Sequence, residues 1–497
     1  MKEIPFRKHH PKGLYTLFAT EMWERFSYYG MRALLVLYLT AELVNNGFGL
    51  DREAALEIYA IFTGLVYLTP ILGGWVSDKL LGKRKTVYIG GLVMAVGQFL
   101  LASSSFLIQS IDTESRLFLF HFGLGVLIIG NGFFKPNIST VVGEFYNDND
   151  PMKDSAFNIF YLGINLGAIL GTFIAGGLGE SVNWGYGFLA AGIGMIIGVL
   201  WLNWRETTLE HYGLHENTPD EKMKLDGKDW STILIYVASL IIGTLALIYF
   251  WGFLSEDARS YITYIGFAAI IISLSFIIFK GTNGANEWSR MAVIIILAIF
   301  NVVFWAGFEQ AGGTFSLFAK DNTDRMMFGW EMPATWFQNV NSFAILIFAT
   351  LFSLMWLWLD KKGWNPRTPV KFALGLFLGA IAFWVMTQAA NVASGGNLVS
   401  PWWLVSVYTL LTLGELMLSP IGLSMITKLA PTKLVSVVMG LWMASFAAGN
   451  YMAGMLESIL VKYDFELYPF ITMVMLGSGV LLLLLSPFLN KAMKGIH

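Results

Sequence analysis

Long apolar segments recur along the whole chain, separated by short polar loops, and they constrain the fold more than any other feature. Clear examples run over 86–108 and 185–204. A helix that crosses a bilayer needs about 20 mostly apolar residues, because the hydrocarbon core is about 30 Å thick. Only 13% of the residues are charged, whereas a soluble domain carries about 25%. The chain therefore lacks the polar surface of a soluble fold, and we predict a multi-pass membrane protein.

Fourteen segments satisfy this length criterion. They lie near 14–43, 54–77, 86–108, 115–141, 155–179, 185–204, 230–253, 261–279, 290–318, 333–359, 370–389, 401–428, 434–457 and 468–490. We therefore predict the fold class to be an all-α polytopic membrane protein with fourteen transmembrane helices.

Lysine and arginine residues are distributed unevenly between the loops. If the N-terminus lies in the cytoplasm, the basic loops at 79–85, 222–228 and 361–371 are also cytoplasmic. Because basic residues concentrate on the cytoplasmic side of membrane proteins, both termini are predicted to be cytoplasmic. The first apolar run contains Glu21 and Arg25 and ends at no small-residue cleavage site, so no cleavable signal peptide is predicted.

An internal repeat suggests that the chain contains two duplicated halves. The run GNGFFKP begins at Gly130 and the similar run GELMLSP begins at Gly414, an offset of 284 residues, and Asp78 and Asp360 are related by an offset of 282. Duplicated halves with a binding site between them are typical of secondary transporters. The predicted domains are an N-terminal six-helix bundle (1–204), a cytoplasmic linker (205–229), two inserted transmembrane helices (230–280) and a C-terminal six-helix bundle (281–497).

The first predicted helix carries charged and tyrosine side chains on one face. At 100° per residue, these side chains fall within an arc of about 140°. They are Glu21, Glu24, Arg25, Tyr28, Tyr29 and Arg32. Ionisable groups inside a membrane are costly and face protein or a water-filled cavity, so this arc is a candidate functional site. The alternative is a structural ion-pair ladder, in which Glu21 and Arg25 pair across one helical turn.

Three more ionisable residues lie within predicted spans. Lys135 precedes Pro136, which can bend its helix towards a cavity, and Glu415 lies on the corresponding helix of the second half. These two side chains could meet across a central cleft or form a purely structural salt bridge. Glu309 lies in an aromatic, apolar segment. A carboxyl group in such a place is a candidate for binding and releasing a proton, and the alternative is a structural pair that holds two helices together.

Several classes of function are excluded by what the chain lacks. It contains no cysteine and six histidines, and its formal net charge is −2. Without cysteine, iron–sulfur clusters and zinc–thiolate sites are excluded. The slightly negative net charge does not indicate the basic surface that binds nucleic acid. We predict no enzyme activity, no metal and no nucleic-acid partner. A membrane redox enzyme would need a histidine pair in a span, which is absent, and a channel is distinguished from a transporter only by measuring coupled flux.

Two long motifs carry a family resemblance. The run EMWERFSYYG begins at Glu21 and the run FYLGINLG begins at Phe160. They resemble the ExxERFxYYG and FYxxINxG signatures of the proton-dependent oligopeptide transporter family, which is part of the major facilitator superfamily. The GWVSD run from Gly74, the FFKPN run from Phe133 and the GELMLSP run from Gly414 also fit this family. The resemblance covers the whole chain, including the two inserted helices typical of bacterial members.

The resemblance implies a proton-coupled symporter that imports di- and tripeptides by alternating access, as a monomer in the bacterial inner membrane. Protons would be the coupling ion, and no cofactor would be needed. The alternative function keeps the fold and transports another small solute, such as nitrate or a peptide-like compound. An amine-binding Glu415 favours peptides, because an anion carrier has no need of such a group.

The family's roles map onto matched residues in three groups. The residues that bind the peptide's two charged ends would be Arg25 and Lys135 for the carboxylate, and Asn165, Asn341 and Glu415 for the amine. The residues that line side-chain pockets would be Tyr28, Tyr29, Tyr67, Trp305 and Trp442. The proton-coupling residues would be Glu309, paired with Arg32, together with Glu21 and Glu24. For Tyr67, Trp305 and Trp442, packing is an alternative role.

One position departs from the animal members of this family, which carry a functional histidine on the second helix. Ala60 occupies that position here. Proton handling is therefore predicted to depend on the carboxylates.

Overall fold

The computed structural model describes residues 9–147, 150, 152–214, 278–327, 329–431 and 434–493, together with the single positions 227, 231 and 261. Most of the predicted linker and nearly all of the two predicted inserted helices lie outside these residues. The count of fourteen transmembrane helices therefore stays a prediction.

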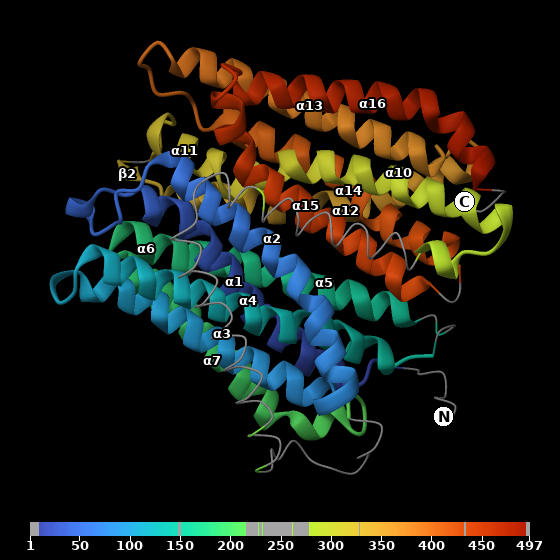
Figure 1. Ribbon diagram of the computed structural model, residues 1–497, viewed down its shortest axis with the longest axis horizontal. Coiled ribbons are helices and arrows are strands. Elements are labelled where there is room, and N and C mark those ends of the chain that lie inside the picture. The colour runs from blue at the N-terminus through green and yellow to red at the C-terminus, as the bar shows by residue number, and fades with distance from the viewer. Residues whose placement is uncertain are drawn as a thin grey trace. The chain divides into compact units, whose positions relative to one another are not determined.

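Helices make up almost all of the described N-terminal half (Figure 1). They are α1 (Lys12–Thr40), α2 (Arg52–Val76), α3 (Lys83–Phe106), α4 (Thr113–Glu144), α5 (Met152–Gly171), α6 (Gly177–Ser181) and α7 (Trp184–Trp204). A π-helical turn, η4 (Thr172–Gly176), joins α5 to α6, and another, η2 (Ser77–Leu81), follows α2. Short 3-10 turns lie at Leu43–Asn45, Leu107–Gln109 and Glu206–Leu209.

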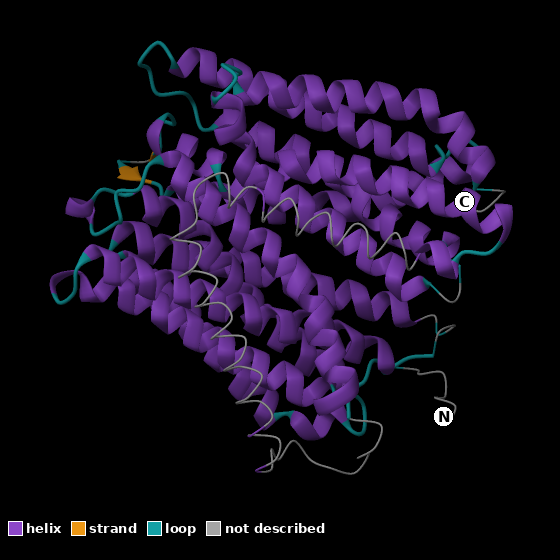
Figure 2. Cartoon of the chain, in the orientation of Figure 1, coloured by secondary structure: helices purple, strands orange, loops and turns teal. Residues whose placement is uncertain are grey.

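The described C-terminal half is also helical, apart from one small hairpin (Figure 2). Its helices are α10 (Gly284–Phe308), α11 (Thr314–Asp321), α12 (Asn339–Lys361), α13 (Thr368–Ala393), α14 (Trp402–Leu429), α15 (Val435–Val461) and α16 (Leu467–Ala492). The hairpin pairs β1 (Met326–Met327) with β2 (Trp330–Glu331) in antiparallel register. Two 3-10 turns, η6 (Glu309–Gly312) and η7 (Ala334–Gln338), precede α11 and α12.

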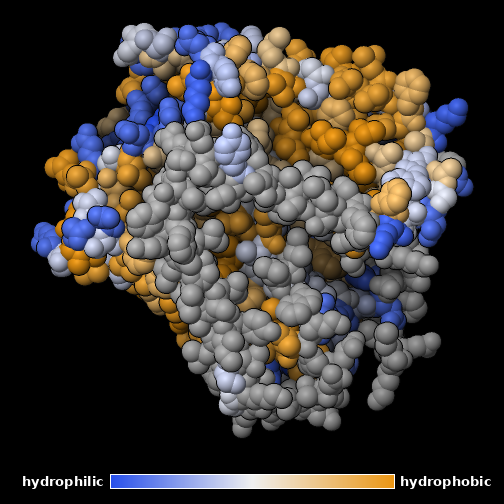
Figure 3. Space-filling view, in the orientation of Figure 1, coloured by the Kyte–Doolittle hydropathy of each residue, from blue (hydrophilic) through white to orange (hydrophobic). Residues whose placement is uncertain are grey.

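The predicted all-α membrane architecture is confirmed. Within the described part of the chain, nine helices are long and apolar enough to cross a membrane. Every predicted span in that part coincides with helical structure to within a few residues, although the span at 290–318 is interrupted by η6. Over α13 and α16 the surface is apolar, as Figure 3 shows, and α16 exposes large apolar side chains such as Leu484 and Phe488. Such a surface suits contact with lipid.

The chain divides into two compact units. The first holds Met1–Leu245 together with Arg325–Phe343, and the second holds Ala246–Asp324 together with Ala344–His497. The grouping of Arg325–Phe343 with the first unit had no signal in the sequence, because this segment follows α11 in the C-terminal half. Helix α12 consequently starts in the first unit and continues into the second.

Glycines allow α5 to approach α1 closely. A Cβ atom on Gly167 would lie 2.1 Å from the carbonyl oxygen of Met22, and one on Gly171 would lie 2.2 Å from that of Phe26. Both distances are far below contact distance, so only glycine fits at these positions. Small residues spaced by four on a membrane helix commonly allow this kind of packing. Gly167, the second glycine of the FYLGINLG motif, therefore allows α5 to pack against the charged turn of α1.

The first residues of the predicted linker fold back onto the first unit. Arg84, at the start of α3, donates to the carbonyl oxygens of Tyr212 at 2.5 Å and Leu209 at 2.7 Å. Glu144, at the end of α4, accepts from the backbone N–H of Gly213 at 2.7 Å and contacts Lys83 at 2.5 Å. These bonds fasten residues 209–213 to the end of the bundle that is predicted to be cytoplasmic.

At the opposite end, Arg116 fixes the loop between α1 and α2. The side chain is buried, and its guanidinium group donates to the carbonyl oxygen of Ser104 at 2.8 Å and to the hydroxyl group of Tyr38 at 3.2 Å. It also reaches the carbonyl oxygens of residues 46–47 at 3.4 Å and lies 4.8 Å from the centroid of the Phe48 ring.

We expect Arg116→Met to lower the free energy of unfolding by about 1–3 kcal/mol, because it leaves buried carbonyl groups without donors. Thermal unfolding in detergent would show a lower Tm than the wild type. Lys462→Met, which removes an exposed cation, is the matched control and should leave the Tm unchanged. An unchanged Tm for Arg116→Met would mean that water replaces the arginine without cost.

Candidate functional site

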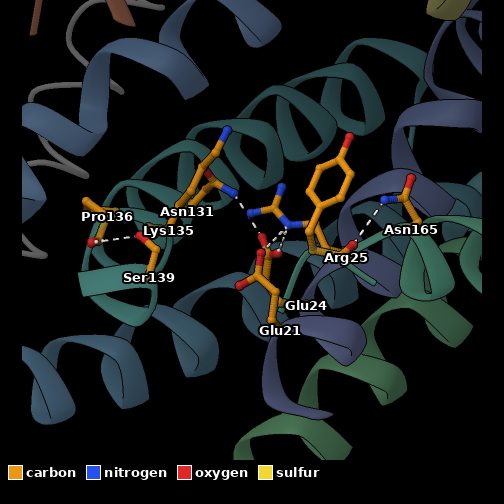
Figure 4. A network of polar contacts seen from close by, with 9 residues as sticks. Glu21, Glu24, Arg25, Asn131, Lys135, Pro136, Ser139 and Asn165 are labelled. Carbon is orange, nitrogen blue, oxygen red and sulfur yellow. Dashed lines mark hydrogen bonds and ion pairs between the residues drawn. The ribbon is translucent and has the colours of Figure 1, made fainter. Parts of the chain in front are cut away.

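The charged residues of α1 form a buried network (Figure 4). The Nε atom of Arg25 lies 2.7 Å from Glu21 Oε1 and 2.8 Å from Glu24 Oε2. All three side chains are buried, and Glu24 is completely so. One guanidinium nitrogen is therefore shared by two carboxylates. The pair across one turn between Glu21 and Arg25, which the sequence indicated as a structural alternative, is present.

Helix α4 supplies the rest of the network. Asn131 donates from Nδ2 to Glu24 Oε1 at 3.0 Å, and Lys135, one turn further along α4, acts electrostatically on Glu24. The Nζ atom of Lys135 lies 3.9 Å from the centroid of the Tyr67 ring on α2. With Glu21, the network contains two carboxylates and two cations, so its charges balance. Balanced charge matters because each buried ion costs several kcal/mol in lost hydration unless it is compensated.

Three oxygens of the network make no hydrogen bond among the described residues: Glu21 Oε2, Glu24 Oε2 and Asn131 Oδ1, of which Glu24 Oε2 is ion-paired with Arg25. Glu21 Oε2 is buried and has no donor, whereas Oε1 of the same group accepts from Arg25. A role of Glu21 in proton coupling stays a prediction.

Aromatic rings surround the two arginines of α1. The Tyr28 and Tyr29 rings have centroids 5.3 Å apart in an edge-on arrangement. The guanidinium carbon of Arg25 lies 5.9 Å from the Tyr28 centroid, and that of Arg32 lies 5.7 Å from the Tyr29 centroid. Arg32 also donates from Nε to the hydroxyl group of Tyr59 at 3.2 Å. Both arginines therefore lie against aromatic rings, in the arrangement of a cation–π contact.

Sequence reasoning missed two polar partners in this unit. Asn131 lies four residues before Lys135 and so on the same helix face, a spacing that could have revealed it. Tyr59 precedes Ala60, the position at which the animal proteins carry histidine, but nothing in its own spacing relates it to Arg32. Asn165, which sequence reasoning included, lies on α5 (Figure 4) and donates to the Tyr161 carbonyl oxygen at 3.0 Å.

In the second unit, Glu309 lies where α10 changes to the 3-10 turn η6, and its side chain is buried. The adjacent Gln310 stabilises this break. It donates from Nε2 to the carbonyl oxygens of Ala306 at 3.2 Å and Ala453 at 2.8 Å, and it accepts from the hydroxyl group of Thr314 at 2.8 Å. Interrupted helices at membrane depth are tolerated only where protein or a cavity satisfies the freed backbone groups. Gln310 thus stabilises the 3-10 turn that carries the carboxyl group of Glu309.

Two predicted pocket-lining tryptophans pack inside the second unit. The ring centroid of Trp305 lies 4.8 Å from that of Phe308 and 4.9 Å from that of Phe446. Trp442 is fully buried, and its centroid lies 6.2 Å from that of Phe446. Both indole N–H groups are buried without a hydrogen-bond partner among the described residues. Packing accounts for these contacts, and roles in a substrate pocket stay predictions.

The remaining predicted residues are half-buried. Glu415 lies on α14 in the second unit, and Asn341 lies on α12 in the part that groups with the first unit. The predicted pairs of Lys135 with Glu415 and of Arg32 with Glu309 each join one unit to the other, and they stay predictions. Within the described residues, no group of three or more histidine or acidic side chains converges to hold a metal ion.

Comparisons with known proteins agree on one family. The model of the POT family matches residues 84–473. The peptide transporter YePEPT of Yersinia enterocolitica is 35% identical, over 96% of this chain and 94% of its own. The di-/tripeptide transporter of Lactococcus lactis is 34% identical, over 98% of this chain and 97% of its own. A crystal structure of the peptide transporter POT in complex with sulfate has a TM-score of 0.84 and 35% identity, covering 99% of this chain and 98% of the other.

These matches extend over nearly the whole chain, and they include both the motif-bearing helices of the first unit and the helices of the second. The chain therefore belongs to the POT family and has its major facilitator fold.

Proposed function

We propose that this protein is a proton-coupled symporter that imports di- and tripeptides by alternating access. The observation that carries the proposal is the buried, charge-balanced network of Glu21, Glu24, Arg25 and Lys135. The relatives named as peptide and di-/tripeptide transporters support the same substrate class. The proposal includes a monomer in the bacterial inner membrane with both termini in the cytoplasm and no cofactor.

The network suits a peptide carboxylate. A zwitterionic peptide needs a cation for its carboxylate, and Arg25 and Lys135 are the cations of the network. Binding of the carboxylate adds one negative charge to a group that already contains two acids and two bases. A proton on Glu21 or Glu24 restores the balance, so peptide and proton should each favour binding of the other. Such coupling is reciprocal by thermodynamic necessity.

The opposite end of the peptide needs an anion or amide oxygens. We assign this role to Glu415, Asn165 and Asn341, and we assign the proton that drives transport to Glu309 in exchange with Arg32. One proton moving through 100 mV supplies about 2.3 kcal/mol, and tenfold accumulation costs about 1.4 kcal/mol, so one proton can sustain roughly 50-fold accumulation.

Uptake of a labelled dipeptide into proteoliposomes tests the proposal. We expect accumulation only when an inward proton gradient is imposed. Unlabelled di- and tripeptides should compete, whereas C-terminally amidated and N-acetylated dipeptides should compete at least tenfold less well, since each lacks a charge that the site binds. Equal competition by free and amidated peptides would remove Arg25 and Lys135 from the carboxylate site. Competition by nitrate with none by peptides would favour the alternative solute, and uptake without proton coupling would favour a channel.

A further inference from the structure

A carboxylate on α6 caps the N-terminus of the helical segment that leads into α12. The side chain of Glu180 accepts the backbone N–H of Ala334 on Oε2 at 2.9 Å and that of Thr335 on Oε1 at 2.7 Å. Both donors belong to the first turn of η7, which runs directly into α12. The first N–H groups of a helix have no partner within it and carry partial positive charge. The residue before the turn is Pro333, whose side chain has no atom that can accept a hydrogen bond. The acceptors come instead from Glu180, on a different helix.

Close packing accompanies this cap. Trp336 donates from Nε1 to the Phe173 carbonyl oxygen at 3.3 Å, and the centroids of these two rings lie 4.7 Å apart. A Cβ atom on Gly176 would lie 2.7 Å from the hydroxyl oxygen of Thr335, so η4 and η7 touch at that point. Thr335 is completely buried, and its hydroxyl group makes no hydrogen bond among the described residues.

The position of Glu180 is itself fixed by α1. A Cβ atom on the preceding residue, Gly179, would lie 2.5 Å from Leu34 Cδ2, so α6 lies directly against Leu34. Leu34 is two residues after Arg32 on the same helix. The cap therefore rests on the helix that carries the candidate site.

The division of α12 between the two units gives this cap a mechanical consequence. Its first residues, up to Phe343, group with the first unit, and the rest, from Ala344, belongs to the second. Because α12 belongs to both units, any motion of one unit relative to the other must either break the bonds to Glu180 or bend α12 near residues 343–344. By the predicted orientation this end faces the outside, where a peptide enters.

We propose that Glu180 is a gating residue, whose carboxylate latches the outer end of α12 onto α6 and releases it once in each transport cycle. The inference rests on the proposed alternating-access function. It assigns to Glu180 a positioning role, with no contact to substrate or proton.

Single-cysteine labelling tests the latch directly, because the chain has no cysteine of its own. Thr335→Cys would be labelled with a membrane-impermeant maleimide in right-side-out vesicles, in the wild-type, Glu180→Gln and Glu180→Ala backgrounds. We expect labelling about tenfold or more faster with Glu180→Ala, because two charge-assisted hydrogen bonds are lost, and an intermediate rate with Glu180→Gln, whose amide keeps one acceptor. Glu53→Ala, which removes an exposed carboxylate from the first turn of α2, is the matched control and should not change the rate. Equal labelling in all backgrounds would overturn the proposal.

A cross-link separates a moving latch from a purely structural cap. In Gly176→Cys/Thr335→Cys the two Cβ atoms would lie 3.0 Å apart, slightly less than the 3.5–4.5 Å of disulfides, so a small shift joins them. Oxidation should stop dipeptide uptake, and reduction should restore it. Undiminished uptake by the oxidised protein would refute the latch, even if Glu180→Ala failed to fold. If the wild type itself took up no peptide, the proposed function would fail, while the labelling rates would still report whether Glu180 closes this end.

Discussion

Glu309→Gln is expected to abolish proton-driven accumulation of peptide while preserving peptide binding and counterflow exchange. Glutamine has the size and neutral charge of a protonated glutamate, so the variant mimics a carrier that never releases its proton. Exchange of internal for external peptide needs no net proton movement and should continue. The measurement is dipeptide accumulation under an imposed proton gradient, compared with exchange in the same proteoliposomes.

The structure provides a control for this experiment. The break between α10 and α11 is maintained by the bonds of Gln310 to Ala306, Ala453 and Thr314, which Glu309→Gln leaves in place. Gln310→Leu removes those bonds and should reduce accumulation, exchange and Tm together. If Glu309→Gln behaved like Gln310→Leu, Glu309 would be a structural residue. If it still concentrated peptide against a gradient, the proton site would lie elsewhere, and Glu21 and Glu24 would be the candidates.

The fold was predictable because lipid imposes strict rules on sequence. Each span must be long, apolar and helical, so hydropathy alone placed the ends of helices such as α7 and α13 to within a few residues. The polar arc of α1 was predictable for the same reason, because charged residues are rare in membrane-spanning helices and therefore stand out in the sequence. The structure places both Glu21 and Glu24 of this arc in contact with Arg25.

Features that depend on tertiary contacts were not predictable. Glycines at 307, 312 and 313 are the only local signal of a break near Glu309, because residues 305–311 contain no proline. The break is stabilised from a distant helix, α15, through Ala453. The docking of Arg325–Phe343 onto the first unit depends on Glu180, which lies more than 140 residues earlier. Periodicity reports which face of a helix is buried, but it does not report the partner.

Arg25→Met is expected to cause a second large effect, on stability and transport together. It leaves Glu21 and Glu24 buried without the guanidinium nitrogen that they share. Removing one partner of a buried ion pair costs about 3–5 kcal/mol, because an uncompensated charge remains. Chemical unfolding in detergent should show a loss of this size, and dipeptide uptake should be undetectable.

Loss of uptake in that variant has two explanations, which the double variant Arg25→Met/Glu24→Gln distinguishes. The double variant removes one charge of each sign, so the pair of Glu21 and Lys135 remains in balance, and most of the stability should return. If Arg25 binds the peptide carboxylate, uptake stays absent although the protein is stable, because the cation that the substrate needs is missing. Recovery of uptake together with stability would show that Arg25 serves only to neutralise Glu24, and the carboxylate site would then rest on Lys135 alone.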